Sequence, residues 1–255
     1  MRLSVCTTVM LLTLAATAGG QTAESDVAEG DRAYAALDIP AALDHYEKAV
    51  AESPKNYEAL WKAARTAIDL GTPAADAAKR NALFGTAEHY ARQAVAVNPG
   101  DAEGHFVLAW ALGKTALTQS ARRRVKYGTD VRAQALECLR LKPGHTGCLH
   151  VMGVWNAEVM RLNSLVRLIA RNILGGRVLG SASWSEAVRY MEAAVAGDPQ
   201  RIVHRLDMGE IYRDVGDKAK ARAQFETGLR LPVTDYNDRR FKADIQADLD
   251  RLGSD

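Results

Sequence analysis

The side chains best suited to chemistry lie close together near the middle of the chain. His145, Cys148 and His150 offer imidazole and thiol groups, which are common zinc ligands. His145 lies in a predicted turn, however, and no fourth ligand follows at a spacing known for metal sites. Packing and surface roles account for these residues, and no metal site is predicted.

Two other arrangements fall short of a catalytic or cofactor site. Residues 175–180 (GGRVLG) are rich in Gly, but the Lys-Ser/Thr pair and the preceding strand of a phosphate loop do not accompany them. The Ser, His and Asp residues each fit a helix cap or a solvent-facing position equally well. The sequence therefore predicts a protein that is not an enzyme and that holds no cofactor.

The composition is that of a globular protein with an uneven charge distribution. The 255 residues are 47% hydrophobic and 25% charged, and the formal net charge is +2, which does not suggest a nucleic-acid binder. Residues 114–180, however, contain 12 Lys and Arg against 3 Asp and Glu. This excess either attracts an acidic protein partner or an anionic membrane surface, or forms a solvated face. Its densest part is Arg122, Arg123, Arg124 and Lys126.

The N-terminus has the three parts of a signal peptide. Arg2 precedes an apolar run, and Ala16 and Ala18 have the spacing that a signal peptidase recognises. The sequence therefore predicts a signal peptide over residues 1–20, cleaved near Ala18 or Gly20, and a secreted or periplasmic protein. The alternative is a membrane anchor formed by residues 3–18.

Two cysteines remain after such a cleavage. Cys138 and Cys148 lie ten positions apart across a predicted turn between helices. Export favours a disulfide, whereas both residues also fit as small buried side chains. Both alternatives stay open.

A repeated pattern indicates the fold. The last copy has small and aromatic residues at the spacing of a tetratricopeptide repeat, namely Gly209, Tyr212, Gly216, Ala221 and Phe225. Gly30, Ala42, Tyr46 and Ala49 form a similar first copy. Each copy ends in a proline, and these prolines are 45, 44, 56 and 33 residues apart: Pro54, Pro99, Pro143, Pro199 and Pro232. Small residues let two antiparallel helices approach closely, and the proline then ends the second helix.

The predicted fold class is all-α, a right-handed α-solenoid of about five degenerate tetratricopeptide-like helix pairs with a C-terminal capping helix. The repeat domain covers residues 21–255, with repeats at about 25–54, 55–99, 100–143, 144–199 and 200–232 and a cap at 234–252.

Residues 157–174 read as one amphipathic helix. Their apolar stripe consists of Val159, Leu162, Val166, Ile169 and Ile173. Such a stripe serves as the core face of a repeat helix, or as a surface for a partner or a peripheral membrane contact.

Several segments together resemble the regulator of microtubule dynamics family over residues 27–252. They are residues 57–65 (YEALWKAAR), 94–99 (AVAVNP), 105–110 (HFVLAW), 149–155 (LHVMGVW) and 184–190 (WSEAVRY). The resemblance implies an adaptor without catalytic residues that lies behind an N-terminal membrane or targeting segment. The family name implies association with tubulin, but a cleaved signal peptide would separate this chain from tubulin.

The sequence thus favours an exported adaptor that binds a protein partner in a concave groove. The alternatives are a membrane-anchored microtubule or organelle-contact adaptor, and a periplasmic solenoid that binds a small molecule near residues 157–179. The candidate contact residues lie on the first helix of each repeat, where inter-repeat packing is the alternative role for Trp and Tyr. They are Trp61, His105, Trp110, His150, Trp155 and Tyr212, with Arg122, Arg123, Arg124 and Lys126 as an electrostatic contact.

Overall fold

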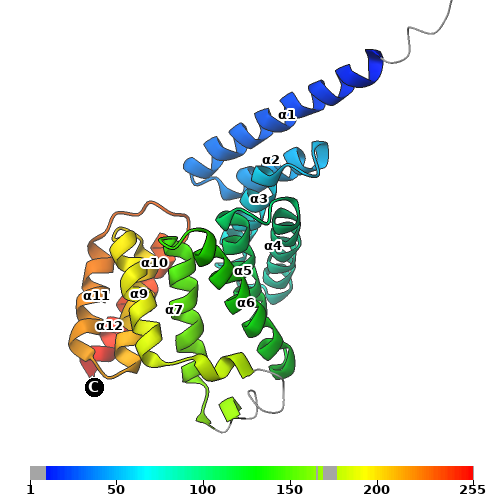
Figure 1. The fold of residues 1–255 in the computed structure, drawn as a ribbon. Coiled ribbons are helices and arrows are strands. Elements are labelled where there is room, and N and C mark those ends of the chain that lie inside the picture. The colour runs from blue at the N-terminus through cyan, green and yellow to red at the C-terminus, as the bar shows by residue number, and fades with distance from the viewer. Residues whose placement is uncertain (1–9, 165, 169–176, 255) are drawn as a thin grey trace, which may run out of the picture.

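The computed structural model describes residues 10–164, 166–168 and 177–254, and all regular structure within them is helical (Figure 1). The elements are α1 (Met10–Ala35), α2 (Ile39–Glu52), α3 (Tyr57–Gly71), α4 (Ala77–Val97), α5 (Ala102–Ala116), α6 (Ala121–Leu141), α7 (Thr146–Arg161), the 3-10 helix η1 (Arg177–Ser181), α9 (Trp184–Gly197), α10 (Ile202–Asp214), α11 (Lys218–Arg230) and α12 (Asp238–Ser254).

The helices pack in five successive pairs, α1–α2, α3–α4, α5–α6, α7–α9 and α10–α11, and α12 packs against α10 and α11. This arrangement confirms the predicted all-α solenoid with a capping helix. Helices α4 and α6 are 21 residues long, against 14 for α2 and 13 for α11. The wide proline spacing in the second and third repeats thus comes from longer second helices.

Close contacts within the pairs depend on glycine. A Cβ atom on Gly30 would lie 2.5 Å from the ring of Tyr46, and one on Gly209 would lie even closer to the ring of Phe225. Both aromatic side chains are fully buried. The small and aromatic residues of the repeat pattern therefore form the contact between the two helices of a pair.

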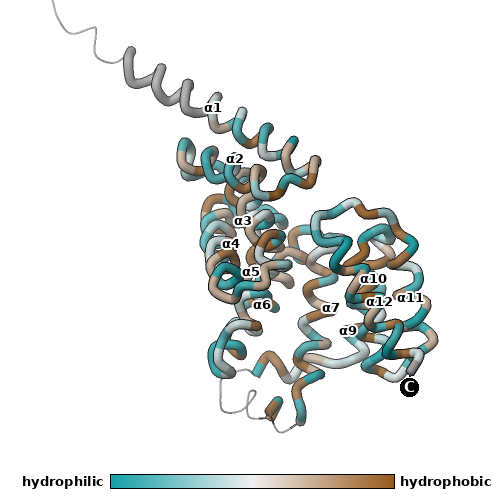
Figure 2. Tube along the Cα trace, turned by 180° about the vertical axis from the view of Figure 1, so that it is seen from behind, coloured by the Kyte–Doolittle hydropathy of each residue, from teal (hydrophilic) through white to brown (hydrophobic). Residues whose placement is uncertain are grey.

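The helix starts follow from polar side chains just before them. Asp38, Asn56, Asp76, Ser183 and Asp217 each accept a hydrogen bond from the backbone N–H three residues later. Such caps satisfy backbone donors that the first turn of a helix leaves unpaired. The tube in Figure 2 alternates between hydrophilic and hydrophobic segments along the helices, as expected for helices that bury one face.

The first helices of successive pairs contact one another, α3 with α5, α5 with α7 and α7 with α10, and α10 also contacts α12. These helices form an inner layer, and we call the surface they share the inner face.

The beginning of α12 returns to the first half of the array. Asn237 donates a hydrogen bond from Nδ2 to the backbone oxygen of Asp69, at 3.2 Å, and Arg240 donates to the backbone oxygen of Thr72. These contacts join residues 168 positions apart. The capping helix therefore closes the array onto the end of α3.

The N-terminal helix α1 continues without interruption through the predicted cleavage positions Ala18 and Gly20. Its later residues Ala23 and Val27 are buried against α2 and α3. Residues 1–9 of the predicted signal peptide lie outside the described residues, and cleavage stays a prediction. Within the described part of the chain, no helix combines the length and the apolar character needed to cross a membrane.

The prediction of one continuous helix over residues 157–174 is wrong. Helix α7 ends at Arg161, and Leu162 is extended, with φ −63° and ψ 135°. Asn163 then accepts a hydrogen bond from the Val166 N–H at 2.8 Å, which caps the helical residues that follow it. Val159 is buried and Val166 is exposed, so the apolar stripe does not lie on one face. Ile169, Ile173 and the glycine pair at 175–176 lie outside the described residues.

Candidate partner-binding face

Helices α3 and α5 place aromatic and basic side chains on the inner face. Trp61, Arg65 and Asp69 follow one another at intervals of four residues on α3, and so lie on one side of that helix. Trp110 and Lys114 have the same spacing on α5. Trp61 and Trp110 are half-buried, and the guanidinium of Arg65 lies 5.2 Å from the ring centroid of Trp61.

Asp69 is the buried acid at the point where α12 closes the array. The Tyr34 hydroxyl donates a hydrogen bond to Asp69 Oδ2 at 2.8 Å, and the carboxylate is 2% exposed. Burial, followed by the nearby charge of Asp235, raises the pKa of Asp69 to about 7. This carboxyl group therefore titrates near neutral pH.

Helices α7 and α10 contribute a network of acids and histidines. His150 Nε2 lies 2.5 Å from Asp207 Oδ2, and the His150 ring centroid lies 4.8 Å from that of His204. Burial, together with His150, lowers the pKa of His204 to about 2. Burial also raises the pKa of Glu210 to about 7, with the charge of Asp207 as the next cause. His150 and Asp207 pair with one another, whereas Glu210 pairs with Arg161 at 3.1 Å.

Lys114 is a cation of the inner face to which the described residues supply no hydrogen bond, ion pair or ring contact. It is partly buried, and no hydrogen bond or ion pair to it is formed within the part of the chain that the structure describes. Burial lowers the pKa of its ammonium group, while the charges of Asp207 and Asp69 oppose that shift and Arg240 adds to it. The charges that act on the ammonium are thus those of Asp69 in α3, Asp207 in α10 and Arg240 in α12.

Three of the predicted contact residues have internal roles. His105 is 6% exposed and its ring nitrogens lie 2.7 Å from Gln134 Oε1 and 3.0 Å from the Pro99 oxygen. Trp155 donates from Nε1 to the Gly128 oxygen at 2.7 Å, and the Tyr212 hydroxyl donates to Glu192 at 2.8 Å.

Both Trp155 and Tyr212 are 6% exposed. These three side chains pack and bond within the array, which leaves Trp61, Trp110 and His150 as the accessible members of the predicted set. Lys114 was missed, because its spacing from Trp110 carries no signal until the helices are assembled.

The basic cluster lies at the N-terminal end of α6, in the middle pair of the array and away from the closing contact. Its four members are exposed, and none forms an ion pair with a carboxylate in the described ranges: Arg122, Arg123, Arg124 and Lys126. Helix α6, which carries them, contacts η1, and Leu179 of η1 lies 3.7 Å from a Cβ position built on Gly128.

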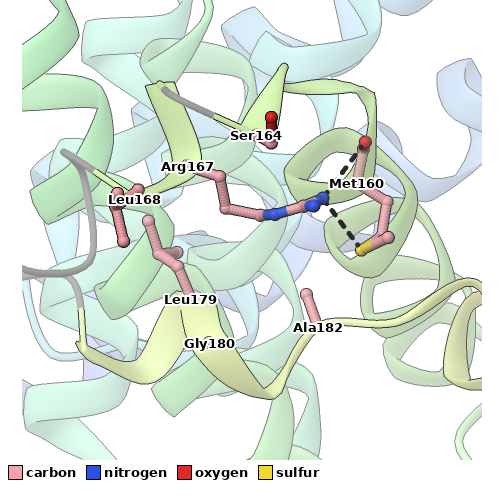
Figure 3. A pocket seen from close by; sticks show the side chains of 7 residues that line it. All are labelled: Met160, Ser164, Arg167, Leu168, Leu179, Gly180 and Ala182. Carbon is pink, nitrogen blue, oxygen red and sulfur yellow. Dashed lines mark hydrogen bonds between the residues drawn. The ribbon is translucent and has the colours of Figure 1, made fainter.

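A small pocket lies beside this basic cluster. Its lining consists of Met160, Ser164, Arg167, Leu168, Leu179, Gly180 and Ala182 (Figure 3). The Arg167 side chain reaches across it to Met160, with Nη1 3.3 Å from the sulfur. The exposed side chains of Leu117, Val166 and Leu168 are 57%, 43% and 48% accessible. This region of the molecule thus combines positive charge with apolar surface.

The cysteine pair forms a separate buried cluster. Cys138 and Cys148 are joined in a disulfide that links α6 to α7, with a Cα–Cα distance of 6.4 Å. The ligand atoms of these cysteines and of His145 lie within 4.8 Å of one another. His150, which the sequence grouped with His145 and Cys148, pairs with Asp207 instead. Cys138 takes its place, because the turn between α6 and α7 folds the two helix ends together.

Comparisons with known proteins agree with this architecture. The family model of the regulator of microtubule dynamics protein 1-3 matches residues 26–253. The chain is similar to regulator of microtubule dynamics protein 3 of Xenopus laevis, with 25% identity over 190 residues, which are 74% of this chain and 41% of that protein. It therefore spans about two fifths of the length of that curated relative.

Two solved structures share the fold. A tetratricopeptide-repeat protein of Thermus thermophilus has a TM-score of 0.60 and 22% identity, and the match covers 88% of this chain and 99% of that one. A monomeric IFIT1 mutant solved with m7Gppp-AAAA has a TM-score of 0.54 and 21% identity, covering 91% of this chain and 55% of that one.

Proposed function

Because the chain belongs to the regulator of microtubule dynamics protein 1-3 family, we propose that it is a non-catalytic adaptor that binds a segment of a protein partner on its inner face. Solenoids of helix pairs present such faces as extended binding surfaces. The observation that carries the proposal is the ammonium of Lys114, which has no partner among the described residues and lies on the same side of α5 as the half-buried ring of Trp110.

This arrangement favours a partner segment with acidic and apolar residues. An acidic side chain of the partner would supply the ion pair that Lys114 lacks, and apolar neighbours would cover the tryptophan rings. Asp207 and His150 already satisfy one another, so we expect the contacts to lie on the side of α3 and α5.

A charge reversal tests this proposal on a partner identified by crosslinking. Lys114→Glu should weaken binding by about 10-fold or more, because it replaces an attraction in a partly buried site with repulsion. Lys79→Glu is the matched control, since Lys79 is an exposed lysine on the outer helix α4. Equal affinities of the two variants would exclude Lys114 as a contact.

For the location, we propose export with cleavage near Ala18 or Gly20. The intact mass and cell fraction of the native chain decide this point. A species that begins near Gly19 or Gln21 in the periplasm or medium supports export. A full-length species in the membrane fraction would instead favour an anchor at residues 3–18 and an adaptor role at microtubules, for which the Xenopus relative is named.

The surface around residues 122–126 combines positive charge with exposed apolar side chains, and this combination favours a membrane contact as a second function. We propose that this surface lies against an anionic membrane, where Leu117, Val166 and Leu168 would enter the interface and the basic side chains of residues 122–126 would face the lipid headgroups. Arg124 donates a hydrogen bond from Nη2 to the Leu117 oxygen at 3.3 Å, so charge and apolar surface are adjacent.

Vesicle sedimentation tests this second contact. The chain should sediment with vesicles that contain phosphatidylglycerol and not with pure phosphatidylcholine, and Leu168→Ser should reduce the bound fraction. Binding to both kinds of vesicle, or to neither, would contradict it. The small-molecule alternative rests on the pocket of Figure 3 and stays a prediction.

A further inference from the structure

A second group of side chains, which lies where α6 meets α7, has the composition of a metal site. Cys138 lies in the last turn of α6, Cys148 lies in the first turn of α7, and His145 caps α7. All three are buried, and their ligand atoms lie within 4.8 Å of one another. The two cysteines are oxidised to a disulfide in this structure.

The imidazole of His145 is already oriented toward the cysteines. Its Nε2 lies 3.1 Å from Glu103 Oε1, and its Nδ1 accepts a hydrogen bond from the Cys148 N–H at 3.2 Å. The Nδ1 lone pair therefore faces the end of α7 that carries Cys148. In metalloproteins, a carboxylate that accepts the other ring N–H fixes a histidine ligand in this way.

We propose that the reduced form of this cluster binds one zinc ion through Cys138 Sγ, Cys148 Sγ and His145 Nδ1, with Glu103 as the residue that orients the imidazole. Zinc takes the Nδ1 lone pair, so the hydrogen bond from the Cys148 N–H is given up when the metal binds. Thiolate and imidazole are the ligand types that zinc prefers, and three protein ligands leave a fourth position for water. The zinc site and the disulfide are two states of the same pair of cysteines.

A surface pocket gives a route to the cluster. Ala102 packs against both cysteines in the buried cluster, and it also lines a pocket together with Glu103 and Lys142. Leu141 is the other side chain shared by the pocket lining and the cysteine cluster. We expect a cation or a small thiol to reach the cluster from this pocket.

The conversion balances with a thiol reductant. Two molecules of a low-molecular-weight thiol, RSH, reduce the disulfide to two cysteine thiols and form RSSR. Zn²⁺ then replaces the two thiol protons, and these protons are released to solvent. In the reverse direction, RSSR accepts two electrons from the two thiolates and two protons from solvent, which restores the disulfide, regenerates two RSH and releases Zn²⁺.

Metal titration of the full chain tests the proposal. After reduction and removal of metal, native mass spectrometry should show one Zn²⁺ per chain, and Co²⁺ should produce a thiolate-to-cobalt charge-transfer band. The oxidised chain should show neither. Glu103→Gln should weaken zinc binding by about 10- to 100-fold, the usual effect of removing such an orienting partner.

His145→Asn is the sharpest variant, because Asn also caps helices well but is not an imidazole ligand. It should weaken zinc binding by at least about 100-fold, more than the loss of the orienting carboxylate. His150→Asn is the matched control on the same helix and should bind zinc like the unaltered chain. Circular dichroism of both variants establishes that they are folded.

Three results would overturn the proposal. They are a reduced chain that binds no zinc, an oxidised chain that binds zinc equally well, and His145→Asn with the affinity of the unaltered chain. Cys138→Ser, which lacks one of the two thiolates, should also lose zinc binding. If this variant does not fold, the comparison of His145→Asn with His150→Asn still decides whether the cluster binds zinc.

Discussion

Two glycine substitutions should have opposite effects on stability, although the chemical change is the same. Gly209 and Gly113 both lie inside first helices, α10 and α5. A Cβ atom on Gly209 would meet three ring atoms of Phe225 within 2.8 Å, whereas one on Gly113 would meet nothing within 4 Å. The space around each glycine therefore decides the sign of the effect.

The magnitudes follow from two opposing contributions. Replacing Gly by Ala inside a helix stabilises it by about 0.8–1 kcal/mol. Overpacking a buried site costs about 1–3 kcal/mol, and the short contacts with Phe225 place Gly209→Ala at the upper end. We expect Gly113→Ala to stabilise the chain by about 1 kcal/mol and Gly209→Ala to destabilise it by about 2 kcal/mol.

Thermal unfolding separates the two variants. In a domain of this size, 1 kcal/mol corresponds to about 2–4 °C in Tm, so the variants should differ by about 6–12 °C. Gly209→Ala combined with Phe225→Leu should recover part of the loss, because the smaller side chain relieves the overlap. Equal stabilisation by both single substitutions would refute the role of Gly209 as a close-contact position.

Three further predictions concern the closing contact and the charged surfaces. In urea unfolding, the stability of Asp69→Asn relative to the unaltered chain should increase as the pH rises from about 5 to about 8. Because the pKa of Asp69 is raised to about 7, its contribution to the free energy of unfolding is largest below pH 4 and is lost as the pH rises through 7, with about 1.4 kcal/mol for each pKa unit. A difference in stability between the two chains that does not change with pH would contradict this assignment. Asn237→Ala should speed hydrogen exchange in the first turn of α12 and at the end of α3 but not in α9, and unchanged rates would show that the closing contact is weak. Reversing the arginines at 122–124 to Glu should slow association with an acidic partner and flatten its salt dependence in stopped-flow kinetics, whereas an unchanged salt response would exclude electrostatic steering.

The helix pairs were predictable because their signal is local. In the first and last copies, glycine, alanine and an aromatic residue have the same mutual spacing and precede a proline, and the structure packs Gly30 on Tyr46 and Gly209 on Phe225. The break after Arg161 was missed because apolar residues continue at helical spacing beyond it. The helix ends at Arg161 and Asn163 caps the helical residues that follow, although the hydrophobic pattern continues across the break.

Contacts between distant residues were beyond sequence reasoning. The hydrogen bond from Asn237 to Asp69 closes the array across 168 positions, and it depends on the curvature that all the intervening pairs produce together. The burial of Trp155 likewise depends on the Gly128 oxygen of the neighbouring helix. Such partners become apparent only after the pairs have been assembled.

Site-specific photo-crosslinking in the native host tests the central claim most directly. A benzophenone amino acid would replace Trp110 on the inner face or His89, an exposed residue of the outer helix α4. We expect that one protein partner crosslinks at position 110, that the crosslink is reduced by Lys114→Glu, and that the same partner does not crosslink at position 89. A partner that crosslinks equally at both positions, or only at position 89, would contradict this expectation.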